Sequence, residues 1–363
     1  MGLAFSIAGA GALLVADEAP EDVDQGVPAS PAPSSALQTP SQGGMDESPS
    51  PSSQTSLLYV ERGWLMQAGL GQADNAVRVL RVGTAQVAAS PDGGSVALVV
   101  ERGSPRDSDF GDEPHVVLVD LATEDRVNLG PGFAPMWSPG GTRLAFLRPV
   151  EDRECFSETC LGEAELVVAD RDGSAKTLTE PGSWGVLGWV GDEVVVSHET
   201  GSPETMKVAI DGRRQVLELS PSSFWGTSPD GRWIVSSDDG EVVIHPISTE
   251  GVLGAPSPIN TSGRSLGAGA WSPDSSMLAG VLVGESLIGR DNVIAAISPT
   301  APIPTTVKGS RGAIGQVLWV GPSEIIFVSM QGRAVVVRRC EVPHGPCDDV
   351  SKDLREVSLV GIR

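Results

Sequence analysis

A short turn phrase recurs along the chain, and this repetition constrains the fold more than any other feature. Its four clearest copies are Ser90-Pro91-Asp92-Gly93, Trp137-Ser138-Pro139-Gly140, Ser228-Pro229-Asp230-Gly231 and Trp271-Ser272-Pro273-Asp274. Pro presets φ for the second position of a tight turn, Asp bonds nearby backbone amides, and Gly accepts positive φ. A β-rich run follows each copy within a few residues. We therefore interpret each copy as strand, turn, strand, with the Asp residues as turn formers.

Two further segments occupy the same place in the repeat but lack the Ser-Pro-Asp residues of the phrase. They are Trp189-Val190-Gly191-Asp192 and Trp319-Val320-Gly321-Pro322. Successive phrases are then 48, 52, 38, 44 and 48 residues apart, and a four-stranded propeller blade takes about 40–50 residues. The apolar runs are short and β-branched, without the 3.6-residue period of helical repeats. A Trp at the end of the incoming strand can pack its ring between adjacent sheets.

The segments Trp137–Phe146 and Ser228–Val235 resemble the repeat of TolB-like, or WD-repeat-like, β-propellers. In that family a W-S-P-D-G phrase joins the two innermost strands of a blade, and a later strand ends in a D-x-x-x-G turn. Candidates for the later strand are Val116–Thr123, Leu166–Gly173 and Val208–Gly212. The resemblance covers about Ala85 to Arg339. It implies an all-β propeller but no particular activity, because the family is defined by its scaffold.

The number of blades depends on the two ends of the repeat region. Six phrases give six blades, but residues 57–82 also read as strands, and residues 355–362 read as one more. Together these segments could form a seventh blade that the chain termini close, which would remove exposed sheet edges. Seven blades within residues 57–363 average about 44 residues each, and six would average about 51. We expect seven four-stranded blades, with six as the alternative.

The N-terminal region differs in composition from the rest of the chain. Residues 3–16 form an apolar block that fits the core of a signal peptide and is short for a membrane helix. No Lys or Arg precedes Arg62, so we expect the natural start to lie upstream, and residues 1–16 to be a truncated signal or membrane anchor. Residues 17–56 are rich in Pro, Ser and acidic residues and are predicted to be a disordered linker. The predicted propeller domain is 57–363.

The four cysteines form two close pairs, Cys155 with Cys160 and Cys340 with Cys347. Each pair can close a small local loop, and two such disulfides would indicate an oxidising compartment. A zinc site or free buried thiols are the alternatives. Together with the N-terminal block and linker, the cysteines predict an extracytoplasmic protein that is membrane-anchored or secreted, touching the membrane only through its N-terminal segment.

The net charge of −22 argues against binding of nucleic acid or anionic lipid through the overall field. The long connections should join the second and third strands of blades, at Arg102–Pro114, Arg148–Glu163, His198–Glu204 and Gly284–Asn292. Long loops on a rigid scaffold usually carry binding function, so we expect the binding face to lie opposite the turn phrases. Its candidate residues are Asp107, Asp109, Asp112, Glu113, Glu151, Asp152, Glu158 and His198.

Sequence motifs for catalysis or cofactors were sought as well. Residues 107–113 carry carboxylates at spacings that a calcium loop uses, but the Glu at position 12 of an EF-hand is missing. No H-E-x-x-H, G-x-S-x-G or phosphate-binding loop occurs. We therefore expect no catalytic residues, no cofactor and no enzymatic activity, with Ca²⁺ as the alternative.

These patterns predict a monomeric, tethered β-propeller that serves as a non-catalytic protein- or peptide-binding or scaffold module of the bacterial cell envelope. Such a module should have a channel lined by small and apolar residues. One alternative is a Ca²⁺-dependent propeller enzyme, lactonase-like or glycan-active, with carboxylates at the channel mouth. A second alternative is a sensor or spacer domain of a single-pass membrane protein.

Overall fold

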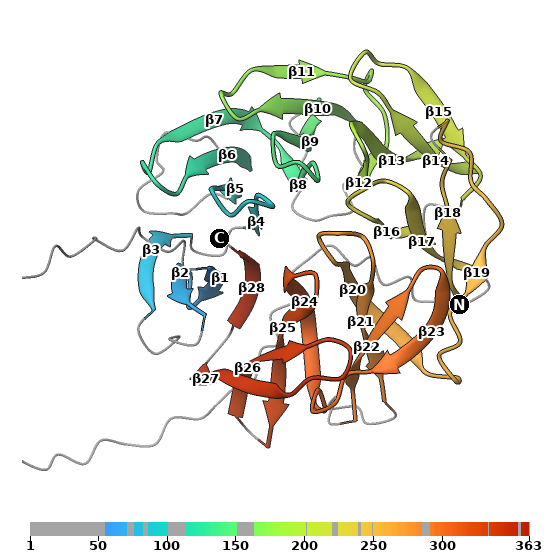
Figure 1. Cartoon of the computed structure of the whole chain (residues 1–363). Helices are drawn as coiled ribbons and strands as arrows, with labels where there is room; N and C mark the ends of the chain where they lie inside the picture. Colours follow the sequence, from blue (N-terminus) through green and yellow to red (C-terminus); the bar gives the residue numbers. More distant parts are fainter. Residues whose placement is uncertain are drawn as a thin grey trace, which may run out of the picture.

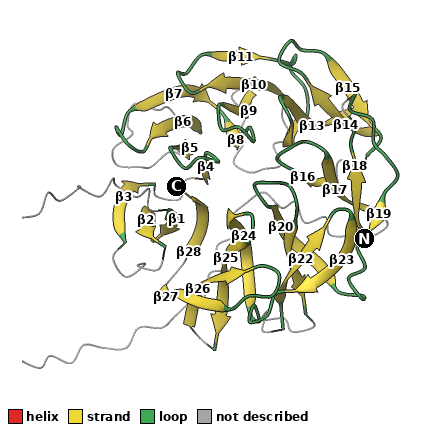
Figure 2. Ribbon diagram, in the orientation of Figure 1, coloured by secondary structure: helices red, strands yellow, loops and turns green. Residues whose placement is uncertain are grey.

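The fold is a ring of seven four-stranded antiparallel sheets (Figures 1 and 2). The computed structural model describes residues 55–70, 76–82, 86–100, 114–150, 163–200, 202–219, 224–238, 241–248, 250–284, 291–332, 334–354 and 357–362. These ranges contain 28 strands and no helix; accordingly, none of them holds a helix that could cross a membrane. The all-β, seven-bladed propeller predicted from the repeat is confirmed.

The blades are numbered in the order in which they follow one another around the ring. Blade one consists of β28 (Val357–Ile362), β1 (Ser56–Glu61), β2 (Trp64–Gly69) and β3 (Val77–Arg81). Blade two consists of β4 (Gln86–Ala89), β5 (Ser95–Val100), β6 (His115–Asp120) and β7 (Arg126–Pro131). Blade three consists of β8 (Phe133–Trp137), β9 (Arg143–Pro149), β10 (Ala164–Asp170) and β11 (Ala175–Thr177). Blade four consists of β12 (Trp184–Val190), β13 (Glu193–Thr200), β14 (Ser202–Val208) and β15 (Arg214–Leu217).

The remaining three blades repeat the same order from the innermost strand outward. Blade five consists of β16 (Phe224–Thr227), β17 (Trp233–Asp238), β18 (Glu241–Pro246) and β19 (Ser257–Pro258). Blade six consists of β20 (Ser265–Trp271), β21 (Leu278–Val283), β22 (Val293–Ser298) and β23 (Ala301–Thr306). Blade seven consists of β24 (Ala313–Gly321), β25 (Glu324–Gln331), β26 (Ala334–Glu341) and β27 (Cys347–Leu354).

The C-terminal strand closes the ring. Strand β28 pairs antiparallel with β1, with Leu57 opposite Ile362 and Glu61 opposite Val357. It occupies the innermost position of blade one, where the other blades have the first strand of their own repeat (Figure 1). Blade one is thus built from both ends of the repeat region, as the sequence predicted.

Each Ser-Pro-Asp turn joins the two innermost strands of its blade through the same hydrogen bonds. The Ser90 hydroxyl donates to the Asp92 carboxylate at 2.6 Å and accepts from the amide of Ser95 at 3.0 Å. Equivalent Ser–Asp bonds of 2.6 Å form in the turns that begin at Ser228 and Ser272. The Asp residues are therefore turn formers, as expected. The two degenerate phrases also hold hairpins, between β12 and β13 and between β24 and β25.

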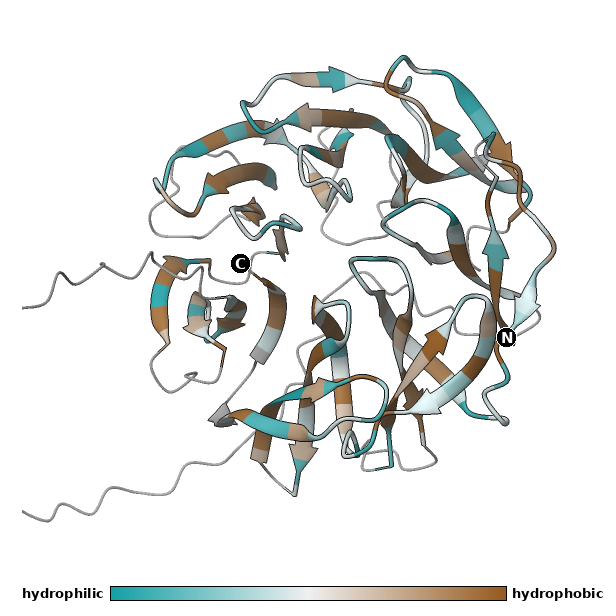
Figure 3. Cartoon of the chain, viewed as in Figure 1, coloured by the Kyte–Doolittle hydropathy of each residue, from teal (hydrophilic) through white to brown (hydrophobic). Residues whose placement is uncertain are grey.

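The hydrophobic core is divided into seven layers, one between each pair of neighbouring blades. Successive side chains of a strand point to opposite faces of its sheet. In β25, Ile325 and Phe327 pack toward blade six, whereas Ile326 and Val328 pack toward blade one. Much of β6, β10 and β28 is accordingly coloured as hydrophobic in Figure 3. Because every blade buries both faces, the stability of the ring depends on each junction.

The disulfide predicted between Cys340 and Cys347 is confirmed. These residues lie directly opposite each other in β26 and β27, with their Cα atoms 4.1 Å apart. The predicted pair Cys155–Cys160 lies outside the described residues, as do the N-terminal block and almost all of the predicted linker. Those two segments and the second pair stay predictions.

An arginine connects the turns of blades two and three. Arg171, in the turn between β10 and β11, donates to both carboxylate oxygens of Asp92 at 2.8 Å. Its Nε also donates to the Gly141 carbonyl at 2.6 Å, and its guanidinium lies 5.6 Å from the centroid of the Trp137 ring. Partial burial raises the pKa of Asp92, but hydrogen bonds from Arg171, Ser90 and Gly94 outweigh it and lower that pKa to about 2.

This contact predicts an acid-dependent loss of stability. The pKa of Asp92 is lower in the folded chain than in the unfolded one, where it is about 3.9. The stabilisation is therefore present above pH 4 and is lost as the pH falls toward 2. Because the Asp92 side chain is 55% exposed, solvent screening limits the effect to about 1 kcal/mol. Urea unfolding at pH 2 to 6 should show a smaller acid-induced loss for Asp92→Asn than for the parent chain.

The matched control is Asp274→Asn. Asp274 accepts the same Ser bond in its own turn, from Ser272, but it forms no ion pair in the described part of the chain. Asp274 also accepts from the Ser276 hydroxyl at 2.8 Å, so the pair compares an Asp that binds Arg171 with one whose hydrogen bonds stay within its own turn. Identical acid profiles for the two variants would show that the Arg171 contact contributes nothing.

Candidate functional site

A cavity of about 350 Å³ lies on the inner side of blades three to six. Four innermost strands, β8, β12, β16 and β20, supply most of its wall, and two turn prolines, Pro139 and Pro229, lie at its edge. The innermost strands of neighbouring blades converge toward the centre of the ring (Figure 1). The cavity is therefore a product of the ring itself, since no single blade contains it.

The wall of this cavity is made of small, apolar and aromatic residues. Three indoles line it, those of Trp137, Trp189 and Trp271, together with the apolar side chains of Met136 and Leu187. Its glycines are Gly188, Gly226, Gly267 and Gly269. Among the described residues that line it, none carries a charge. The wall thus combines small, apolar and aromatic residues from four blades.

The Trp residues before the turn phrases also connect neighbouring blades. The indole Nε1 of Trp137 donates to the Ala88 carbonyl of blade two at 2.9 Å. Trp189 donates to the Met136 carbonyl of blade three at 3.1 Å, and Trp319 repeats the contact with Ala270 of blade six at 2.8 Å. In each case the acceptor is the residue two positions before the first turn residue of the preceding blade. The predicted place of these rings between adjacent sheets is confirmed.

The junction between blades five and six departs from this pattern. The Trp271 Nε1 is buried, yet no hydrogen-bond partner for it occurs among the residues that the structure describes. The register of the other junctions would place the Gly226 carbonyl opposite it. Thr227 takes the Trp position of blade five, and its hydroxyl donates to the Trp189 carbonyl. The turns of blades five and six do contact each other, through the Asp230 amide and the Ser275 hydroxyl at 3.0 Å.

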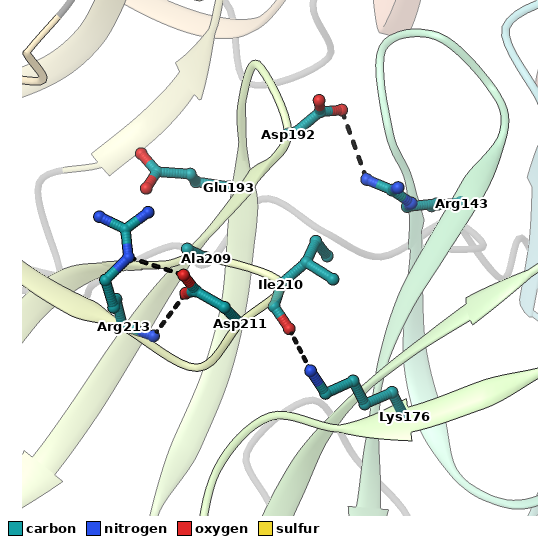
Figure 4. A pocket seen from close by; sticks show the side chains of 8 residues that line it. All are labelled: Arg143, Lys176, Asp192, Glu193, Ala209, Ile210, Asp211 and Arg213. Atoms are coloured by element: carbon teal, nitrogen blue, oxygen red, sulfur yellow. Dashed lines mark hydrogen bonds and ion pairs between the residues drawn. The ribbon is translucent and has the colours of Figure 1, made fainter.

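A second pocket, of about 460 Å³, lies at the turns of blades three and four (Figure 4). It is lined by Arg143, Lys176, Asp192, Glu193, Ala209, Ile210, Asp211 and Arg213. Arg143 lies 3.5 Å from Asp192. Arg213 lies 2.7 Å from Asp211, and Lys176 donates to a backbone carbonyl at 2.7 Å. Its cations already have partners within the chain, so a charged ligand would have to compete with them, and the inner cavity is the better candidate.

The structure corrects the prediction for His198. The segment His198–Glu204 is not a long loop, because β13 extends to Thr200 and β14 begins at Ser202. His198 lies within β13, opposite both Glu204 and Trp184. Its ring stacks on the Trp184 indole, with the ring centroids 3.9 Å apart. Strand β13, whose first residue is followed by three consecutive valines, extends further than the sequence suggested, so this histidine belongs to the body of blade four.

The other predicted binding residues are seven acidic side chains. Asp107, Asp109, Asp112, Glu113, Glu151, Asp152 and Glu158 lie outside the described residues. The candidate calcium loop at 107–113 is among them and stays a prediction. Within the described ranges, no group of three or more His, Cys, Asp or Glu side chains is arranged to hold a metal ion.

The inner cavity was not evident as a site from the sequence. The sequence places Trp137 and Trp271 in turn motifs, and nothing in it singles out Met136, Leu187 or Gly226. One signal was available, because the Trp that opens four of the six turn phrases places an indole at the inner end of a strand. The cavity itself depends on the spacing between blades, which no local pattern encodes.

No family model matches the sequence, and no curated protein matches it. Among solved structures, the chain is similar to the acylaminoacyl peptidase of Pyrococcus horikoshii, with a TM-score of 0.54, 14% identity, and coverage of 82% of this chain and 52% of the peptidase. It is similar to a putative 6-phosphogluconolactonase of Bacteroides uniformis, with a TM-score of 0.51, 11% identity, and coverage of 85% and 99%. It is also similar to TolB of Acinetobacter baumannii, with a TM-score of 0.44, 14% identity, and coverage of 85% of this chain and 67% of TolB.

These similarities concern the fold alone, because all the identities are low. The chain spans about half the length of the peptidase that it matches. The seven four-stranded sheets confirm the propeller fold that the resemblance to TolB-like propellers implied.

The prediction that the chain has no catalytic activity is corrected by these comparisons. Besides the peptidase and the putative lactonase, the neighbours include prolyl endopeptidases, with a TM-score of 0.55, and an oligogalacturonate lyase, with a TM-score of 0.51. The prediction rested on missing catalytic motifs. A scaffold of this kind hosts many functions in sites built from separate segments, so missing motifs and this fold give no ground for excluding an enzyme.

Proposed function

We propose that the chain is an extracytoplasmic propeller that binds a segment of a partner protein in the inner cavity of blades three to six. The main support for this proposal is the composition of the cavity wall, which combines three indoles with glycines and apolar side chains. Trp is enriched among the residues that contribute most to protein interfaces. A volume of about 350 Å³ admits a few side chains, but not a folded domain.

The proposed location outside the cytoplasm rests on the cysteine chemistry and the N-terminal sequence. The Cys340–Cys347 disulfide is typical of proteins that fold in an oxidising compartment. Residues 3–16 have the composition of a signal or anchor segment, and the polar stretch of residues 17–56 would serve as a tether. Such a tether would present the propeller to partners in the bacterial cell envelope.

Site-specific photo-crosslinking in the producing cells tests this proposal. A photoreactive amino acid at Leu187, in the cavity wall, should give a discrete adduct with a partner protein. The same group at Val216, which is 55% exposed on the outer strand β15, should give none. Adducts of equal yield at both positions, or no adduct at Leu187, would contradict a partner in the cavity.

A pair of charge variants connects that adduct to the cavity. Met136→Lys, combined with the Leu187 crosslinker, should reduce the adduct at least tenfold, because it places a cation in an uncharged wall. Val216→Lys makes the same charge change on the outer rim and should leave the yield within twofold. An adduct that persists in Met136→Lys would show that the partner contacts Leu187 without entering the cavity.

A further inference from the structure

Part of the wall of the inner cavity is accessible to an occupant. Three of the side chains that line it, those of Met136, Leu187 and Trp271, are only half-buried. Open space lies beside Gly226, since a Cβ atom added there would meet no atom within 4 Å. The described residues of the wall carry no charge. The occupant that fits such a wall is itself uncharged, because a buried charge without a partner is strongly unfavourable.

An uncharged segment precedes the propeller in the sequence. Residues 25–45 contain no charged residue, and they are bounded by Asp24 and Asp46. Four prolines lie within this segment, namely Pro28, Pro31, Pro33 and Pro40. Proline-rich sequences favour the extended polyproline II conformation, and they bind in grooves lined by aromatic side chains at a small cost in entropy. The segment therefore suits a cavity that three indoles line.

The chain enters the propeller on the face of the ring that carries the turn phrases. In blades two and three, the strand that follows the turn begins at Ser95 and at Arg143. Strand β1 takes the same position in blade one, because it pairs with the innermost strand β28 (Figure 1). Its first residue, Ser56, therefore lies on that face, where the turn prolines Pro139 and Pro229 lie at the edge of the cavity.

The segment is also close enough in sequence to reach the cavity. Residues 46–54, which separate it from Thr55, would span about 28 Å when extended. A domain of this size has a radius of gyration of about 19 Å, so this stretch is long enough to cross from blade one to the inner side of the ring. A tethered segment reaches an effective concentration on the order of 1 mM. Even weak docking would therefore fill the cavity in much of the population.

We propose that residues 25–45 of this chain bind in the inner cavity of blades three to six, with their prolines against the side chains of Met136, Leu187 and Trp271. This inference goes beyond the proposed function, because it gives the same cavity an occupant within the chain and does not require a partner protein. A partner that enters the cavity has to displace the segment, so the segment limits partner binding.

The Leu187 photo-crosslinker tests this inference in the purified full chain, without any partner. We expect an internal crosslink that mass spectrometry maps to residues 25–45, with a yield that does not change on dilution. The same group at the exposed Val216 should give no such crosslink. A crosslink to residues 3–16 instead, a yield that falls on dilution, or no internal crosslink would overturn the inference.

A matched pair of substitutions connects the crosslink to the lack of charge in the segment. Pro31 lies inside the uncharged segment, and Pro49 lies in the stretch that follows it. Pro31→Asp should reduce the internal crosslink at least about tenfold, because it would place a carboxylate against a wall without a cation. Pro49→Asp should leave the yield within about twofold. Equal yields for the two variants would overturn the inference.

Crosslinking in the producing cells separates this inference from the proposed function. If both hold, Pro31→Asp should increase the partner adduct at Leu187 several-fold, because the competing segment no longer fills the cavity. An unchanged partner adduct would overturn the role of the segment as a competitor. A partner adduct without any internal crosslink would overturn the inference and leave the proposed function in place. An internal crosslink without any partner adduct would support the inference and contradict the proposed function.

Discussion

A chain that ends at Leu354, and therefore lacks β28, is expected to lose most of its stability. Strand β28 supplies the innermost strand of blade one and pairs with β1 from Glu61 to Leu57. Its Leu359 packs in the layer toward blade seven, and Val360 packs in the layer toward blade two. Removal of one strand thus opens two of the seven junctions.

The expected loss is large compared with the stability of a typical domain. Burial of one large apolar side chain contributes about 1.5–3 kcal/mol, and a folded domain is stable by only about 5–15 kcal/mol. The truncation removes Leu359 and Val360 and uncovers the edge of β1, which then becomes available for aggregation. The unfolding midpoint should fall by at least about 10 °C, with broader unfolding, as followed by calorimetry and circular dichroism.

Rescue in trans provides the control. A synthetic peptide of residues 355–363, added to the truncated chain, should restore a single cooperative transition near that of the parent. A scrambled peptide of the same composition should not. A truncated chain that unfolds at the temperature of the parent would show that closure by the two termini contributes little.

The second large effect is expected for Phe146→Ala. Phe146 lies in β9, is fully buried, and packs in the layer between blades two and three. Its ring leaves so little space that a Cβ on Gly132 would lie 2.7 Å from its Cδ2 atom. Truncation of a buried Phe to Ala typically costs about 3–5 kcal/mol, because the cavity that remains cannot be filled.

Urea unfolding at neutral pH measures this cost. Ile303→Ala is the comparison, since Ile303 is 72% exposed on the edge strand β23 and its truncation should change the free energy of unfolding by less than about 0.5 kcal/mol. A loss below about 1 kcal/mol for Phe146→Ala would mean that blades two and three move together to fill the space, and that the junctions are less rigid than the packing indicates.

The repeat predicted most of the fold because its chemistry is local. A Ser, a Pro and an Asp at fixed spacing form the same hydrogen-bonded turn in three blades. Together with the three variant phrases they mark six of the seven blades. The same reasoning explains the error at His198. A strand that extends past its expected end has no distinctive turn residue to mark it, and β13 continues to Thr200.

The candidate site was much harder to predict. Its wall comes from four blades, and residues as distant in sequence as Met136 and Trp271 meet there only because the ring closes. The sequence directed attention instead to acidic residues such as Asp107 and Glu151, which lie outside the described residues. It also gave no sign that Trp271 would differ from Trp319, because the two occupy the same place in the repeat.

The sequence by itself determined the repeating unit of this protein, a strand–turn–strand element. Its Ser, Pro, Asp and Gly residues form the turn through interactions with their immediate neighbours alone. The sequence also indicated closure, through apolar β-rich segments at both ends of the repeats. Only the tertiary structure decided how the blades meet. The inner cavity is lined by residues of four blades, and their relative placement is set by packing around the whole ring rather than by any short stretch of residues.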